Sequence, residues 1–195
     1  MLPALVPTIP RRFRKPTVNP IDELRKLTSL FPADASLIHE AGHIPSALTP
    51  EPYKQLLVHE HHMTVTMEEF YRTSVVVRVL DRRQDGNLYY RRILLERSDN
   101  GKVVQFGIVR FDLSYVMPAV RDEIISESTP LGRILINYNV LRHIDLGAIV
   151  SIQPGAELQR LFGCPPGLTT YGRLATIFCN QKPAVDLLEI AAPVG

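Results

Sequence analysis

Two histidines and a glutamate in the segment HEAGH have the spacing of a zinc-binding motif. His39, Glu40 and His43 fit the pattern H-E-x-x-H, in which both histidines bind Zn²⁺ from one helical face and the glutamate acts as a general base. The motif needs a helix, but Gly42 lies inside it and Pro45 follows it closely, and both residue types disfavour helices. A zinc-dependent hydrolase is therefore kept as a third functional hypothesis, beside the simpler interpretation of a loop with solvated histidines.

A second histidine-rich segment, VHEHHM, covers residues 58–63. A third zinc ligand would have to come from Glu60 or from one of His59, His61 and His62, but no spacing selects among them. His59 and His61 are two residues apart, so a strand would place both on one face, where they could bind a metal ion adventitiously. For the function itself we expect neither a metal nor another cofactor.

Charged residues also lie inside two apolar segments further along the chain. In LYYRRILLER, residues 88–97, Arg91 and Arg92 would point to opposite faces of a strand, so one of them would face inward and need an anion. In the apolar run LLEIAAP, Glu189 would be buried, which is costly unless its carboxylate is paired or functional. Two interpretations stay open: an internal Arg–Glu ion pair, or two groups that bind and act on a small acid.

The elements that must hold these residues are predicted from caps, prolines and hydrophobic spacing. Predicted helices begin at Asn19-Pro20, Thr49, Pro118 and Thr129-Pro130. Predicted strands cover residues 73–80, 88–97, 103–111, 141–152, 171–179 and 184–193, with hairpin turns at SDNG and NQKP. The connections within the first group are too short for parallel crossovers. The sequence therefore predicts an α+β fold, an antiparallel sheet of about six strands with helices packed around it.

Composition bounds the class of protein. A net charge of +2 over 195 residues gives no reason to expect a nucleic acid partner. No apolar run approaches the roughly 20 residues of a membrane span, and the first residues make a poor signal peptide, so we expect a cytoplasmic protein with no membrane partner. We expect a flexible basic, proline-rich arm over 1–18, an N-terminal helical extension over 19–50 and a main domain over 51–195. The oligomeric state stays open.

Several short segments, in their order and spacing, resemble the chorismate pyruvate-lyase family. The broader superfamily includes the ligand-sensing UTRA domains of some bacterial transcription regulators. The resemblance covers residues 53–193 and is clearest at Met63-Thr64, Thr129–Arg133 (TPLGR), Gly172-Arg173, Lys182-Pro183, and Glu189 followed by Pro193. It implies that residues 51–195 form a chorismate lyase-like domain, in which an antiparallel sheet encloses a small buried ligand site.

The resemblance also implies an activity. The chain would be an enzyme of aromatic acid biosynthesis, a carbon–oxygen lyase that converts chorismate to 4-hydroxybenzoate and pyruvate by eliminating the enolpyruvyl group, without a cofactor. By position, Arg91 would bind the ring carboxylate, and Glu189 would contact the ring hydroxyl and assist proton transfer. A slip of one residue in the pairing of this strand would exchange Arg91 for Arg92.

Other positions would complete the ligand site. Met63 and Leu131 would supply wall and backbone contacts, and Arg173 or Arg133 would supply a second cation for the side-chain carboxylate of chorismate. The alternative from the same superfamily is a non-catalytic, UTRA-like domain that binds a small acid. Turnover of chorismate separates these two hypotheses, and a metal requirement separates both from the zinc hydrolase.

Overall fold

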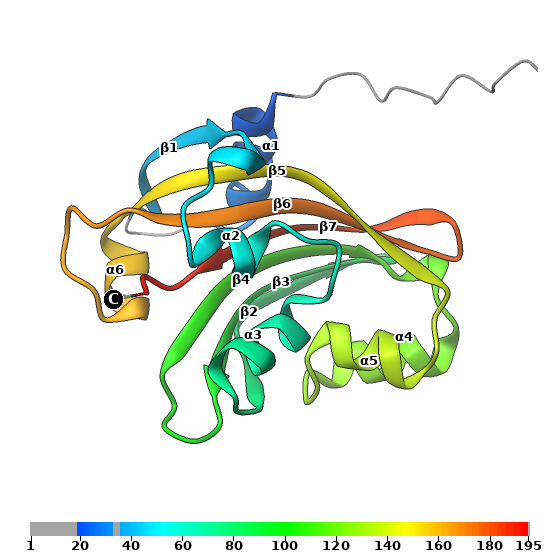
Figure 1. Cartoon of the computed structure of the whole chain (residues 1–195). Coiled ribbons are helices and arrows are strands. Elements are labelled where there is room, and N and C mark those ends of the chain that lie inside the picture. The colour runs from blue at the N-terminus through cyan, green and yellow to red at the C-terminus, as the bar shows by residue number, and fades with distance from the viewer. Residues whose placement is uncertain (1–18, 33–35, 195) are drawn as a thin grey trace, which may run out of the picture.

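Seven strands form one antiparallel sheet, and helices pack on both of its faces (Figure 1). This computed structural model describes residues 19–32 and 36–194. The strands are β1 (Ile38–Ile44), β2 (Val75–Asp85), β3 (Leu88–Arg97), β4 (Val103–Asp112), β5 (Arg142–Pro154), β6 (Thr170–Cys179) and β7 (Lys182–Ala191). Their order in the sheet is β1-β5-β6-β7-β4-β3-β2. The predicted α+β class, with an antiparallel sheet and helices around it, is confirmed.

The helices divide between the two faces of the sheet. They are α1 (Pro20–Thr28), α2 (Tyr53–Leu57), α3 (Met63–Tyr71), α4 (Pro118–Ser126), α5 (Leu131–Asn137) and α6 (Ala156–Phe162), with 3₁₀ turns η1 (Ser46–Leu48) and η2 (Leu113–Tyr115). Helices α1 and α6 pack on one face, and α2 to α5 contribute to the apolar clusters on the other. Strands covered on both sides should be apolar at nearly every position. In β3, accordingly, Tyr90 and Leu94 pack towards α1 and α6, while Ile93 and Leu95 lie on the opposite face.

Three of the four predicted helix starts lie within one residue of the observed ones, but the helix predicted from Thr49 begins only at Tyr53, as α2. The side chain of Asn19 caps α1 by accepting a hydrogen bond from the Ile21 backbone N–H at 3.0 Å. Helix α4 begins at Pro118. Helix α5 begins one residue later than predicted, after Pro130, because the Thr129 hydroxyl donates to Glu123 instead of capping the helix.

Three elements differ from the prediction. The segment HEAGH belongs to β1, which pairs with β5 at the edge of the sheet. The Met63-Thr64 pair, where no helix was predicted, begins the nine-residue helix α3. The region after β5, where no helix or strand was predicted, contains α6 between Gly155 and Gly163. Gly163 ends this helix in the left-handed conformation, with φ of 63°, which glycine adopts at little cost.

The strand conformation of HEAGH rules out the zinc site proposed for it. Four residues along a strand span about 13 Å, so His39 and His43 cannot both lie within about 2 Å of one ion. Both histidines and Glu40 are exposed at this edge of the sheet. The zinc hydrolase hypothesis is therefore wrong for this segment, and so is the loop interpretation.

The predicted N-terminal division can be followed only in part. The arm over 1–18 lies outside the described residues. The extension over 19–50 contains β1 and η1 as well as α1, and β1 joins it to the same sheet as the strands of the main domain. Within residues 19–32 and 36–194, no helix is long and apolar enough to cross a membrane.

Candidate functional site

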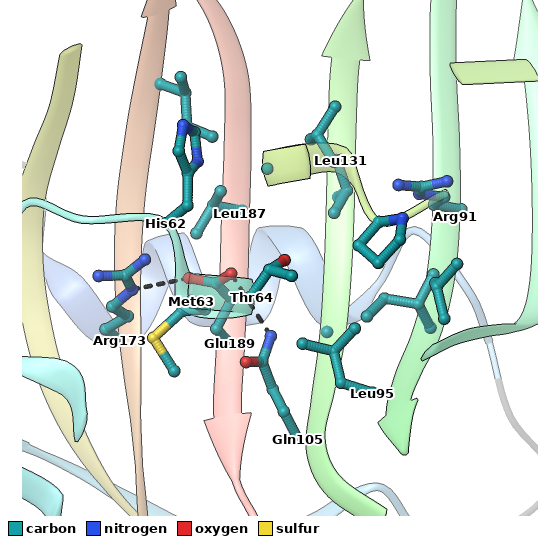
Figure 2. A pocket seen from close by; sticks show the side chains of 17 residues that line it. His62, Met63, Thr64, Arg91, Leu95, Gln105, Leu131, Arg173, Leu187 and Glu189 are labelled. Carbon is teal, nitrogen blue, oxygen red and sulfur yellow. Dashed lines mark hydrogen bonds and ion pairs between the residues drawn. The ribbon is translucent and has the colours of Figure 1, made fainter. Parts of the chain in front are cut away.

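A cavity of about 40 Å³ lies between the sheet and the N-terminal ends of α3 and α5 (Figure 2). Four neighbouring strands form its floor, and the segment before α3 and the start of α5 form its roof. The floor residues are Arg91, Ile93, Leu95, Gln105, Gly107, Val109, Leu187, Glu189, Arg173 and Ile177. The roof residues are His62, Met63, Thr64, Pro130, Leu131 and Gly132, and Val77 of β2 completes the lining.

Strand register explains which side chains meet on this floor. Ile93 pairs with Gly107, Gly107 with Glu189, and Glu189 with Arg173, so these residues form one row across β3, β4, β7 and β6. Gly107 leaves the centre of the row without a side chain. A Cβ atom there would lie 3.2 Å from the Ile93 side chain, so glycine allows Ile93 to pack this closely against β4.

Arg91 enters the cavity from β3 and is only 2% exposed. Its Nε and Nη1 atoms find no hydrogen-bond partner among the residues that the structure describes. Burial lowers the pKa of the guanidinium, and the neighbouring Tyr89 and Glu127 offset part of this effect. Glu127 itself accepts a hydrogen bond from the Tyr89 hydroxyl at 2.6 Å and pairs with Arg82 at 2.8 Å. The positive charge at the cavity wall is therefore incompletely compensated.

The neighbouring Arg92 lies on the other face of the strand. Its Nη1 pairs with Oε1 of Glu157, from α6, at 3.0 Å. This placement answers the question of register, because Arg91 and not Arg92 lines the cavity.

Glu189 and Arg173 form an ion pair in the cavity wall. Arg173 Nε donates to Glu189 Oε2 at 2.6 Å, and the Gln105 amide nitrogen donates to Glu189 Oε1 at 3.4 Å (Figure 2). Arg173 is 1% exposed in its side chain and Glu189 13%, so the pair is shielded from water. The carboxylate predicted to act on a substrate is thus already engaged by a neighbouring cation.

Arg173 also fastens the segment that leads into the roof. Its Nη1 donates to the backbone carbonyl of His59 at 3.1 Å, and its Nη2 donates to that of His61 at 3.0 Å. All three guanidinium nitrogens therefore have partners within the protein. Arg173 positions the start of α3 over the cavity and leaves few donors for a ligand.

Two histidines of this segment have pKa values of about 4, well below their ordinary value of 6.5. Burial is the main cause for both. The charge of Arg173 contributes next for His59, and the charge of Arg142 contributes next for His62. His62 Nε2 accepts a hydrogen bond from Arg142 Nε at 2.7 Å, a contact that requires this nitrogen to be unprotonated.

The histidine pair His59 and His61 is not arranged as a metal site. His59 Nδ1 accepts the His61 backbone N–H at 3.1 Å, and its Nε2 lies 2.8 Å from the Leu56 carbonyl, so both ring nitrogens are occupied. Over the part of the chain that the structure describes, no group of three or more His, Cys, Asp or Glu residues could hold a metal ion.

The structure brings most of the predicted site residues together. Arg91, Glu189, Arg173, Met63 and Leu131 line the same cavity, although they come from five different elements. Arg133 does not line it. Its Nη2 pairs instead with Glu68 of α3, and its side chain is 40% exposed.

Sequence reasoning missed several lining residues, chiefly Gln105, Gly107, Thr64 and His62. A signal for two of them was present. In VVQFGIVRF, a glutamine and a glycine interrupt an otherwise apolar strand, and glycine inside a strand often marks a close approach by a ligand or backbone. Thr64 was noted only as part of the family resemblance and His62 only as a candidate metal ligand, because their place at the cavity depends on how α3 sits on the sheet.

Comparisons with known proteins give similarity in fold only. No protein-family profile matches the chain, and no curated protein matches it. Among solved structures, the effector domain of PhnF from Mycobacterium smegmatis shares 11% identity over 68% of this chain and 88% of that one, with a TM-score of 0.49. A longer PhnF structure gives 11% identity over 67% of this chain, a TM-score of 0.48, and a match to 63% of its own length.

A third similar structure is the ligand-binding domain of a putative GntR-family transcriptional regulator from Bordetella bronchiseptica. It shares 12% identity over 60% of this chain and 85% of that one, with a TM-score of 0.44. At this level of identity the likenesses concern the fold alone, and none of these three structures is described as a chorismate pyruvate-lyase.

The predictions of a chorismate lyase and of a place in aromatic acid biosynthesis are not borne out by these comparisons. The similar structures are described as regulators and as their effector or ligand-binding domains. In the site itself, the carboxylate of Glu189 that was predicted to be catalytic is held by Arg173.

Proposed function

We propose that this chain is a non-catalytic domain that binds a small organic anion in the cavity, with Arg91 as the anchoring cation. The observation that carries the proposal is the buried Arg91 guanidinium, two of whose nitrogens are without partners in the described part of the chain. Leaving such a charge buried costs free energy, and an anionic ligand would remove that cost.

The rest of the lining indicates what accompanies the anionic group. Ile93, Leu95, Val109 and Leu187 present an apolar surface beside Arg91. Apolar walls with a few placed polar groups are typical of sites for small organic ligands. The ligand class is therefore a small acid with an apolar body, and chorismate and 4-hydroxybenzoate are two candidates within it.

Binding requires movement of the roof. A cavity of about 150 Å³ accommodates benzene, whereas this one measures about 40 Å³. The sheet floor is fixed by backbone pairing, so the roof side chains of Met63 and Leu131 are the groups that would move to enlarge the cavity.

There is a physical reason to propose a non-catalytic domain. A general acid or base must reach the reacting proton, but Glu189 is engaged by Arg173 and Gln105. Chorismate, if it binds, should therefore be recovered unchanged.

Titration calorimetry with benzoate, 4-hydroxybenzoate and chorismate tests the proposal, with benzamide as the matched neutral probe. We expect the acids to bind and benzamide not to bind. Arg91→Met should weaken binding at least about 30-fold, the equivalent of about 2 kcal/mol. Arg92→Lys, on the opposite face, is the matched control and should bind like the unmodified protein. Equal affinity of Arg91→Met and the unmodified protein, or no binding of any acid, would refute the proposal.

A further inference from the structure

A second unpartnered polar group lies in the same cavity. Gln105, from β4, is 2% exposed, and its Oε1 atom has no hydrogen-bond partner within residues 19–32 and 36–194. Figure 2 shows its amide nitrogen directed at Glu189, the one contact that the amide makes there (3.4 Å). The cavity therefore holds unused donors, on Arg91, and an unused acceptor, on Gln105.

The orientation of the Gln105 amide follows from its neighbour. The Glu189 carboxylate is paired with Arg173 and only accepts hydrogen bonds. Rotating the amide by half a turn would place its oxygen against a carboxylate oxygen, which is repulsive. The hydrogen-bond network thus assigns the nitrogen to Glu189 and leaves the oxygen as the free acceptor.

The two unused groups are placed at opposite ends of the floor. Arg91 pairs with Val109, Ile93 with Gly107, and Leu95 with Gln105, so Arg91 and Gln105 lie on the same face, two rows apart. Two rows correspond to about 13 Å along the strands. Gly107, whose missing side chain leaves room for that of Ile93, lies in the row between them. A ligand that spans this row would meet Arg91 at one end and Gln105 at the other.

We propose that Gln105 determines specificity by selecting anions that carry a hydrogen-bond donor, a hydroxyl or an N–H group, at the end remote from the acid group. The inference rests on the proposed function, because it assumes that Arg91 anchors the acid. A buried carbonyl oxygen without a donor costs about 1–3 kcal/mol. A ligand hydroxyl would remove this cost, and a methyl or ring C–H at the same place would not.

Paired acids that differ by one hydroxyl test the inference: benzoate with 4-hydroxybenzoate, and hexanoate with 6-hydroxyhexanoate. In the unmodified protein, the hydroxylated acid of at least one pair should bind about tenfold tighter. Gln105→Met keeps the length of the side chain and removes its acceptor. It should abolish this ratio while leaving the affinity for the plain acid within about threefold. Gln105→Leu serves as a second variant, and circular dichroism and retained binding of the plain acid show that each variant is folded.

The outcomes separate this inference from the proposed function. Equal affinity for the two acids within both pairs would overturn the role of Gln105. A preference for the hydroxylated acid that persists in both Gln105 variants would also overturn it, and would indicate that Glu189 accepts the hydroxyl instead. Either result leaves Arg91-dependent binding of acids intact. Failure of every acid to bind, or an affinity that Arg91→Met leaves unchanged, would instead refute the proposed function and this inference with it.

Discussion

Arg173 donates a hydrogen bond to Glu189 across 2.6 Å, and the two residues face each other on paired strands. The sequence left open whether Glu189 belongs to an internal ion pair or acts on a ligand, and the structure shows the ion pair. Arg173 in turn uses its remaining nitrogens for the carbonyls of His59 and His61. The two residues predicted to contact a substrate thus bind each other, and Arg173 also binds the segment that leads into the roof of the cavity.

Breaking this ion pair should lower the free energy of unfolding far more than breaking a surface ion pair on the same strand. Glu189→Leu leaves the Arg173 charge buried without a carboxylate, so we expect the free energy of unfolding to fall by about 3–5 kcal/mol. Asp186→Leu is the matched control, because Asp186 pairs with Arg110 where both side chains are about one-third exposed. It should cost less than about 1 kcal/mol. Urea unfolding measures both, and similar losses would contradict the buried character of the pair.

The adjacent residues Arg91 and Arg92 should respond oppositely to replacement by methionine in the absence of ligand. Arg91→Met removes a buried, incompletely compensated charge, so the free energy of unfolding should stay constant or rise by up to about 2 kcal/mol. Arg92→Met leaves the buried Glu157 carboxylate without its cation and should lower the free energy by about 3 kcal/mol. A comparable loss in both variants, measured by urea unfolding, would show that Arg91 is already well paired.

Acid should weaken the fold through His59 and His62. Their folded-state pKa values are about 4, against 6.5 in the absence of the fold, so the unfolded chain takes up their protons first as pH falls. Their contribution to stability is complete above pH 6.5 and is lost as the pH falls towards 4. Each histidine contributes a slope of at most about 1.4 kcal/mol per pH unit, less where solvent screens the neighbouring charges.

Urea unfolding between pH 7 and 4.5 measures this slope. His59→Asn and His62→Asn should each make the dependence shallower, and the double variant should do so most. Arg173 and Arg142 are the cations that face these rings, and His61 lies beside both. Slopes that match the unmodified protein in all three variants would exclude the two histidines as the cause.

Gly132→Ala should destabilise the protein although alanine favours helices. A Cβ atom at residue 132 would lie 2.8 Å from the Cβ of His62, closer than real atoms approach. We expect a loss of about 1–3 kcal/mol in the free energy of unfolding, as for other overpacked sites. In a His62→Gly background the clash is absent, so the same change should be neutral or stabilising by up to about 1 kcal/mol. Equal losses in both backgrounds, measured by thermal unfolding, would argue against this contact.

The sequence was sufficient to predict those elements whose conformation depends on residues close to them in the chain. The cap at Asn19, the strand pattern of β2 to β4 and the two hairpin turns are local signals, and the corresponding elements formed. Strand β1 was missed because most of its central residues, His39, Glu40, Gly42 and His43, are polar or glycine, and only pairing with β5 makes them a strand. Helix α6 was missed because glycines and prolines flank a short helical stretch and suggest a loop.

The same distinction applies to the site. Arg91 and Glu189 were recognised because a charged residue within an apolar strand can be seen in the sequence alone. Arg173 lies 16 residues from Glu189 across the predicted hairpin of β6 and β7, whereas Gln105, the other partner of Glu189, lies 84 residues away on β4 and was not predictable. Arg133 shows the same limit, since its partner Glu68 is 65 residues away.

The place of β7 in the sheet also affects how the protein is made. Of the described strands it is the last to be synthesised, yet it lies in the middle of the sheet, between β4 and β6. A nascent chain that has reached residue 181 can pair β2 with β3 and β4, and β1 with β5 and β6, but these two three-stranded halves share no strand pairing until β7 leaves the ribosome. The cavity draws its floor from both halves, so translation must pass Glu189 before the ligand site can exist.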